Sequence, residues 1–165
     1  MESREFKPFG SVSALTLGGG GIGNVWGETS KEESIASVHL ALESGIDHLD
    51  VAPMYGKGEA ERVVGEAIKE RSRDSFRLTT KCALGSMPDE EVYDRFNTSL
   101  IRSLDTMGTD YVDLFLLHSQ LIENDHESQK PDSSFVATGN LTTLKSFYDA
   151  VVPAMETLKK EGKIL

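Results

Sequence analysis

Runs of apolar residues typical of strands alternate along this chain with segments that show helical periodicity. The strand-like runs are residues 12–17, 48–52, 76–81 and 111–117. Each is followed by a segment in which apolar side chains recur every three or four residues. This alternation predicts an α/β fold with a parallel sheet and crossover helices.

Capping residues mark where the first helices begin and end. Ser30 and Glu33 form the sequence pattern of a capping box, and Gly45 is a typical left-handed stop. A second helix is expected at about 59–71, with Glu59 and Glu61 in its first turn, where acidic side chains match the helix dipole. The inward-facing residues expected on these two helices are Ile35, Val38, Leu42, Val63, Val64, Ala67 and Ile68.

The second half of the chain repeats the unit. A third helix should begin near Pro88 and end at Gly108, with one apolar stripe made of Val92, Phe96, Leu100 and Leu104. Helical pattern resumes at about 144–151, and Pro153 is expected to start a new helix that Gly162 ends. Residues 163–165 then resemble the start of a fifth strand.

The last strand of the repeat and the segment after it have distinct compositions. The run at 111–117 is almost continuously apolar, which is typical of a strand covered on both faces. Residues 119–142 are mostly polar, and a loop of that length predicts a surface excursion rather than a domain linker. We therefore expect one domain, 1–165, with a polar insertion at about 119–142.

Composition places the chain among globular proteins outside the membrane. Of its 165 residues, 38% are hydrophobic and 27% charged, and no stretch approaches the roughly 18 apolar residues that a membrane span needs. The first ten residues lack the apolar run of a secretory signal. The lone Cys82 cannot form an internal disulfide and is expected to be a packed thiol. These features predict a cytoplasmic location.

The net charge argues against nucleic acid as a partner. The 27 acidic side chains outnumber the 17 lysines and arginines, giving a formal charge of −10. Phosphate backbones are bound by clustered basic residues. Any bases that clamp the phosphates of an anionic cofactor must be local or must lie outside this chain.

Four polar side chains fall where predicted strands give way to loops. Asp50 ends the second strand, Tyr55 follows it, Lys81 closes the third strand and His118 closes the fourth. In a barrel of parallel strands these positions share the carboxyl-terminal face, where active sites are built. Taken singly, such residues are more often turn caps, packing residues or solvated charges, and only their combination on one face indicates a functional site.

The chain resembles the aldo-keto reductase family through residues 50–56 (DVAPMYG), Thr80 and Lys81, and Leu117 and His118. The likeness extends to the glycine-rich turn, to residues 59–67 and to residues 158–164, so that it spans nearly the whole chain apart from the polar insertion. It implies a (β/α)8 TIM barrel, truncated here to about the first four β/α units. It also implies NADPH-dependent reduction of an aldehyde, ketone or sugar carbonyl, or the reverse oxidation, without a metal.

Roles for the four residues follow from that reaction. Hydride transfer to a carbonyl leaves an alkoxide that needs a proton, and the Tyr55 phenol is the natural donor. A cation at Lys81 would stabilise the phenolate, and Asp50 would hold Lys81 charged and oriented. His118 can donate a hydrogen bond to the substrate oxygen or share the proton with Tyr55. Cofactor contacts are expected from Gly20 and Asp50, and substrate contacts from Trp26 and His118.

The glycines at 18, 20 and 23 satisfy the G-x-G-x-x-G pattern of a Rossmann nucleotide site. That site requires a helix to open within the motif, whereas residues 24–29 are expected to intervene before the Ser30 cap. We therefore expect a loop at the rim of the active site. For Trp26, the alternative to substrate contact is a loop side chain that covers the core.

The remaining histidines do not suggest a metal site. His39 is expected at the surface or boundary of a helix, His126 lies in the polar insertion, and His48 shares a strand face with Asp50 in a structural role.

Two other classes of function stay open at this point. Most groups that bind NADP are expected beyond Leu165, so the chain could be a catalytically silent half barrel that acts only through interactions. Four strands without closure would expose an apolar inner face and unpaired edges, which predicts self-association. A barrel enzyme that uses Lys81 as a Schiff-base nucleophile is the third reading.

Overall fold

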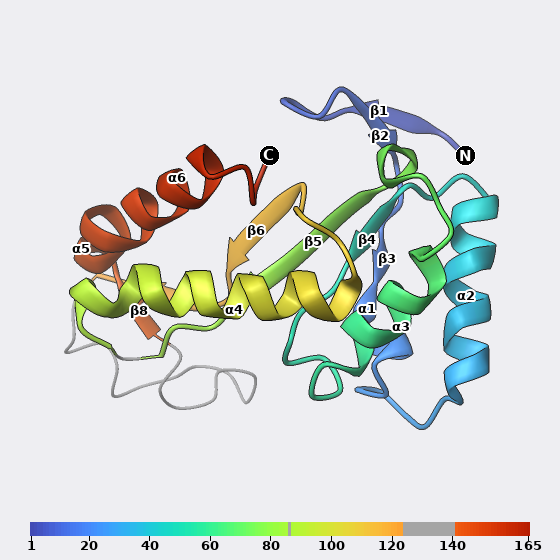
Figure 1. Cartoon of the computed structure of the whole chain (residues 1–165), viewed down its shortest axis with the longest axis horizontal. Coiled ribbons are helices and arrows are strands. Elements are labelled where there is room, and N and C mark those ends of the chain that lie inside the picture. Colours follow the sequence, from blue (N-terminus) through green and yellow to red (C-terminus); the bar gives the residue numbers. More distant parts are fainter. Residues whose placement is uncertain (86, 124–140) are drawn as a thin grey trace.

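A parallel four-stranded sheet forms the centre of the computed structural model, which describes residues 1–85, 87–123 and 141–165 (Figure 1). Its strands lie in the order β3-β4-β5-β6. They are β3 (Leu17–Gly18), β4 (His48–Asp50), β5 (Arg77–Cys82) and β6 (Leu114–Leu117). Because the strands are parallel, their carboxyl ends meet at one end of the sheet.

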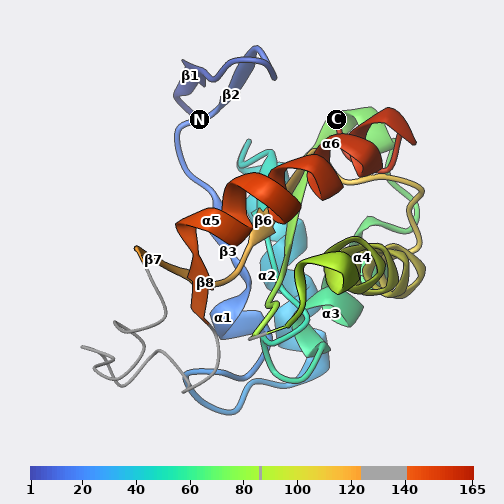
Figure 2. The same ribbon diagram turned by 90° about the vertical axis from the view of Figure 1, so that its left-hand side faces the viewer.

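Helices connect the strands and pack against one another in chain order. They are α1 (Gly19–Ile22), α2 (Lys31–Glu43), α3 (Glu59–Ile68), α4 (Val92–Met107) and α6 (Val152–Lys160), with short 3-10 turns at η1 (Arg73–Ser75) and η2 (Asp89–Glu91). Helix α2 contacts α3, α3 contacts α4, and α4 contacts α6 (Figures 1 and 2). None of the helices in the described ranges is long and apolar enough to span a membrane.

The predicted helix signals are confirmed. The Ser30 side chain accepts a hydrogen bond from the Glu33 amide, and the Glu33 side chain accepts one from the Ser30 amide, which completes the capping box. Gly45 has a φ of 85° and Gly108 a φ of 67°, so both are left-handed stops. The α4 stripe is buried, and every member belongs to the core that α3, α4 and the sheet share: Val92, Phe96, Leu100 and Leu104.

The prediction for the first strand was wrong over most of its length. Residues Ser11–Ser13 form β2, which pairs antiparallel with β1 (Ser3–Glu5), and only Leu17–Gly18 joins the central sheet. The resulting hairpin lies at the end of the sheet where the C-terminus also lies (Figure 1). Its partner strand is polar and carries no apolar pattern, so local periodicity could not reveal the pairing.

The helix expected from Pro153 is present as α6, which begins at Val152 with Pro153 in its first turn, but it follows directly on helical segments that begin earlier. Helix α5 (Leu144–Ser146) runs into a π-helical segment, η4 (Phe147–Val151), and that segment runs into α6. Proline lacks the amide that an α-helix requires at interior positions. The π-helical segment directly before Pro153 changes the local hydrogen-bond pattern, so the chain continues without a break.

Strand β6 is covered on one face only, which corrects the prediction of two covered faces. Phe115 packs edge-on against Phe96 of α4. Leu116 points to the opposite face of the sheet, which is called its inner face here, and is 40% exposed. Ile164 pairs with Val112 in parallel fashion, as expected for the start of a fifth strand. Self-association through the sheet edges stays a prediction.

Two short strands lie within the segment expected to be a polar loop. Strands β7 (Gln120–Ile122) and β8 (Leu141–Thr143) pair in parallel, and the Thr142 hydroxyl donates to Ser119 Oγ across 2.9 Å. Their pairing shows that the ends of the insertion are built into the fold. Residues 124–140, including His126, lie outside the described residues.

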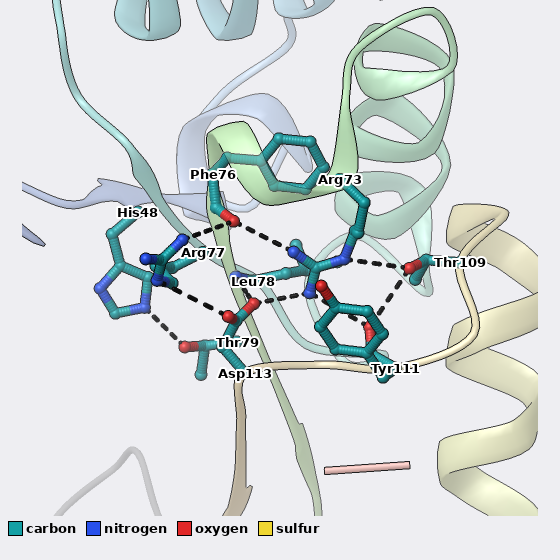
Figure 3. A network of polar contacts seen from close by, with 9 residues as sticks. All are labelled: His48, Arg73, Phe76, Arg77, Leu78, Thr79, Thr109, Tyr111 and Asp113. Atoms are coloured by element: carbon teal, nitrogen blue, oxygen red, sulfur yellow. Dashed lines mark hydrogen bonds and ion pairs between the residues drawn. The ribbon is translucent and has the colours of Figure 1, made fainter. Parts of the chain in front are cut away.

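A polar network fastens β5 to the start of β6 (Figure 3). Asp113, 3% exposed, accepts hydrogen bonds from Arg73 Nη2 at 2.6 Å and from the Leu78 amide at 2.8 Å. The Arg73 guanidinium also donates to the carbonyls of Phe76 and Tyr111. The network therefore pairs a buried carboxylate with a cation and with a strand amide.

Candidate active site

Asp50 and Lys81 meet at the carboxyl end of the sheet. Asp50 is the last residue of β4 and is paired in register with Thr79, so Lys81 stands two residues further along β5 on the same inner face. Lys81 Nζ donates to Asp50 Oδ1 and, across 3.0 Å, to the carbonyl of Val51. The lysine is 7% exposed, and the aspartate side chain is 35% exposed. An ion pair thus holds the lysine in a single orientation.

Tyr55 and His118 complete the cluster. Tyr55 lies in the turn after β4, and Lys81 Nζ stands 4.7 Å from the centroid of its ring. His118 follows β6 directly, and its amide donates to the Cys82 carbonyl across 2.8 Å. The Tyr55 and His118 rings meet edge to face, with centroids 6.0 Å apart. The structure therefore brings together all four residues that the strand-end argument placed on one face.

The electrostatics of the cluster favour a neutral imidazole at His118. Burial lowers the pKa of His118, and the nearby Lys81 ammonium lowers it further, while Asp50 acts in the opposite direction. A neutral imidazole keeps one N–H donor and one acceptor nitrogen. His118 can therefore donate a hydrogen bond to a substrate oxygen near neutral pH.

Trp26 covers Gly20 rather than the core. An added Cβ on Gly20 would stand 2.7 Å from the Trp26 ring, and the tryptophan is 77% exposed. The alternative in which Trp26 shields the core is therefore wrong. Because the ring occupies the open side of Gly20, the space beside this glycine is filled by protein.

A helix does open within the glycine motif, contrary to expectation. Helix α1 begins at Gly19 and lasts for one turn, ending before the 24–29 loop. It follows the edge strand of the sheet and packs on α3 and α2. Since one turn separates this loop from β3, residues 24–29 still lie beside the carboxyl end of the sheet.

His48 has a structural environment, as predicted. Its Nε2 lies 2.7 Å from Thr79 Oγ1, and its Nδ1 lies 3.3 Å from Thr16 Oγ1, so that the ring links neighbouring strands. Burial lowers the pKa of His48, against the opposing effect of Asp50. His39 contacts the Ala67 carbonyl at 3.0 Å, at the boundary between α2 and α3.

The lowered pKa of His48 predicts a pH-dependent contribution to stability. The unfolded chain binds the proton more readily, so this contribution is complete above about pH 6.5 and is lost as the pH falls toward the folded-state pKa. We expect the free energy of unfolding, measured by urea titration, to decrease less between pH 7 and pH 5 in His48→Gln than in the parent. Equal losses in the two proteins would contradict this assignment.

Two buried acids were not recognised as such from the sequence. Glu61 was assigned to the helix dipole, yet it is 3% exposed and accepts a hydrogen bond from Thr80 Oγ1 at 2.7 Å. Its spacing from Val64 and Ile68 places it on the buried face of α3, and that spacing was the available signal. Asp113 interrupts the apolar run at 111–117, and a single acid within such a run was the signal there.

No group of three or more histidine, cysteine, aspartate or glutamate residues that could hold a metal ion is found within 1–85, 87–123 and 141–165. The donor set of the site is instead a phenol, an imidazole and an ammonium–carboxylate pair. These groups move or stabilise protons and suit a reaction in which an alkoxide is protonated.

Comparison with known proteins identifies the family to which the chain is similar. The model of the aldo/keto reductase family matches residues 14–165. The aldo-keto reductase YhdN of Bacillus subtilis is 39% identical over 114 residues, covering 65% of this chain and 34% of that protein. The L-galactose dehydrogenase of Arabidopsis thaliana is 27% identical over 154 residues, covering 92% of this chain and 42% of that enzyme.

A solved structure extends the likeness to the fold. The aldo-keto reductase from Klebsiella pneumoniae in complex with NADPH superposes with a TM-score of 0.69 at 27% identity, covering 99% of this chain and 47% of that one. The fold is thus that of an α/β TIM barrel of oxidoreductases, over about half of its length. The chain belongs to the aldo/keto reductase family.

Proposed function

We propose that this chain contributes to the NADPH-dependent reduction of an aldehyde, ketone or sugar carbonyl to an alcohol, or to the reverse oxidation. The observation that carries the proposal is the placement of the Lys81 ammonium, which binds Asp50 and lies over the Tyr55 ring. A cation beside a phenol stabilises the phenolate that remains after proton donation. Tyr55 is therefore the proton donor, and Lys81 with Asp50 prepares it.

His118 and Trp26 complete the proposed site. His118 stands edge-on to Tyr55 and can donate a hydrogen bond to the carbonyl oxygen that receives the proton. Trp26 is exposed beside the carboxyl end of the sheet and is proposed to contact the substrate. An exposed aromatic ring at a rim offers apolar contact area at low entropic cost.

The nicotinamide cofactor, when bound, supplies the hydride. The partly exposed Asp50 carboxylate is the proposed cofactor contact of this segment, and the solved relative in complex with NADPH supports that choice of cofactor. Gly20 is the other proposed cofactor contact, and because the Trp26 ring lies against it, contact with a cofactor there requires the ring to move.

We also propose that residues 1–165 act as one domain, with 119–142 as an excursion from it. Support comes from the return of the chain after the excursion, since α6 packs on α4 and Ile164 pairs with Val112 of the region before β6.

Substitution of Tyr55 by phenylalanine tests the proposed function. In the full chain, we expect this change to lower the rate of carbonyl-dependent NADPH oxidation by about 100- to 10,000-fold, because it removes the general acid. Tyr148→Phe is the matched control, since Tyr148 is 67% exposed and comes from the distant η4 segment. The measurement is NADPH absorbance with a panel of aldehydes and ketones.

Two outcomes would count against the proposal. Equal turnover by the parent and by Tyr55→Phe would remove Tyr55 from its role as proton donor. Absence of both NADPH binding and turnover in the parent chain would instead favour the non-catalytic, interaction-protein reading.

A further inference from the structure

Glu61 is a buried acid that the proposed proton transfer does not use. It lies in the first turn of α3, and its carboxylate accepts a hydrogen bond from Thr80, which is fully buried on β5. Within the part of the chain that the structure describes, no ion pair to Glu61 is found. Burial of a carboxylate is unfavourable without strong partners, so an apolar side chain would suit packing better.

The hydrogen bond between Glu61 and Thr80 connects the two segments that carry Tyr55 and Lys81. At its own end, the first turn of α3 holds the Tyr55 turn, because the Ala60 amide donates to the Tyr55 carbonyl at 3.3 Å and the Glu59 amide to the Gly56 carbonyl at 3.1 Å. At the other end, Thr80 directly precedes Lys81. Alternation along β5 directs Thr80 toward α3 and Lys81 toward the inner face.

The remaining contacts between α3 and the sheet are largely apolar. Ala60, Val63 and Val64 are buried in the shared core. Apolar contacts are not directional, and they tolerate small displacements of a helix along a sheet. A hydrogen bond of 2.7 Å is directional and weakens steeply when its geometry changes.

We propose that Glu61 is a positioning residue that fixes the Tyr55 turn relative to the Lys81 strand through its hydrogen bond to Thr80. Its catalytic meaning rests on the proposed function of Tyr55 and Lys81, whereas its geometric effect does not. Loss of the Glu61–Thr80 hydrogen bond lets the Tyr55 ring withdraw from His118 and Lys81.

The pKa of His118 is expected to change when the Tyr55 ring withdraws, so it can be used to detect this movement in solution. Burial is the main cause of its lowered pKa, and the Tyr55 ring is one of the groups that cover it. When the ring withdraws, hydration raises the pKa of His118 toward its ordinary value. The pKa can be followed by NMR titration of the imidazole, with the signal assigned through a His118→Gln variant.

The test compares three variants of the full chain. Glu61→Met removes the acceptor while keeping an unbranched side chain, and we expect it to raise the measured pKa of His118 by about 0.5 and to weaken the Tyr55–His118 ring contact in NOE spectra. Glu61→Gln keeps an acceptor oxygen and should behave as the parent. Glu66→Met changes an exposed glutamate of the same helix and should also leave His118 unchanged.

Each result decides for or against the proposal. A folded Glu61→Met variant with the parent pKa and ring contact at His118 would overturn it, because a purely structural role changes only the urea midpoint. If Glu61→Met does not fold, Thr80→Val removes the same hydrogen bond from the strand side. The same rise at His118 then supports the proposal, and an unchanged His118 overturns it. Since no readout requires turnover, failure of the proposed function would be seen separately.

Discussion

Replacing Asp113 by alanine is expected to lower the free energy of unfolding by about 3–5 kcal/mol. The change removes a carboxylate that is 3% exposed and that accepts hydrogen bonds from Arg73 and from the Leu78 amide. The largely buried guanidinium of Arg73 then loses its counter-charge, and a strand amide loses its acceptor (Figure 3). Both losses lower the free energy of unfolding, and urea unfolding of the parent and of Asp113→Ala measures their sum.

The matched control is Asp149→Ala. Asp149 pairs with Lys145 at 2.6 Å, but both side chains are largely exposed, and such pairs contribute little to stability. The control should unfold at nearly the parent urea concentration. Similar midpoints for Asp113→Ala and Asp149→Ala would show that the Arg73 network is not a stabilising element.

The sequence was sufficient to predict the grouping of Asp50, Tyr55, Lys81 and His118. Their positions follow from one geometric rule, that parallel strands bring their carboxyl ends to one face. The rule needs only approximate strand boundaries. It was therefore insensitive to details such as β5 ending at Cys82 rather than at Lys81.

Pairings between distant segments could not be obtained in the same way. The partners of Asp113 lie 35 to 40 residues away along the chain. Glu61 and Thr80 face each other only after α3 has packed on β5. Each of these contacts depends on tertiary packing, to which a periodicity within 11 to 18 residues is not sensitive.

The site adds a constraint on the backbone that side-chain chemistry does not reveal. Gly56, next to Tyr55, has a φ of 61°, and an added Cβ would stand 1.8 Å from the carbonyl oxygen of Gly23. Gly23 directly follows α1. The Tyr55 turn therefore packs closely against the glycine-rich segment after β3. The turn can hold Tyr55 at the cluster only while residue 56 has no side chain.

Gly56→Ala is accordingly expected to lower the free energy of unfolding by about 3 kcal/mol. The left-handed conformation accounts for roughly 1–2 kcal/mol, and the collision with backbone atoms adds about 1–3 kcal/mol. Gly108→Ala is the matched control, because Gly108 has a φ of 67° but nothing within 4 Å of an added Cβ. It should lose only the conformational part, about 1–2 kcal/mol, in the same urea experiment.

The two substitutions should also differ at the candidate active site. Relief of the collision must move the Tyr55 turn away from Gly23, and the Tyr55 ring then loses its edge-to-face contact with His118. We expect the NOE between these rings to weaken in Gly56→Ala and to persist in Gly108→Ala. Equal destabilisation by the two changes, with the ring contact kept in both, would mean that the turn accommodates a side chain at residue 56 and that its approach to Gly23 does not position Tyr55.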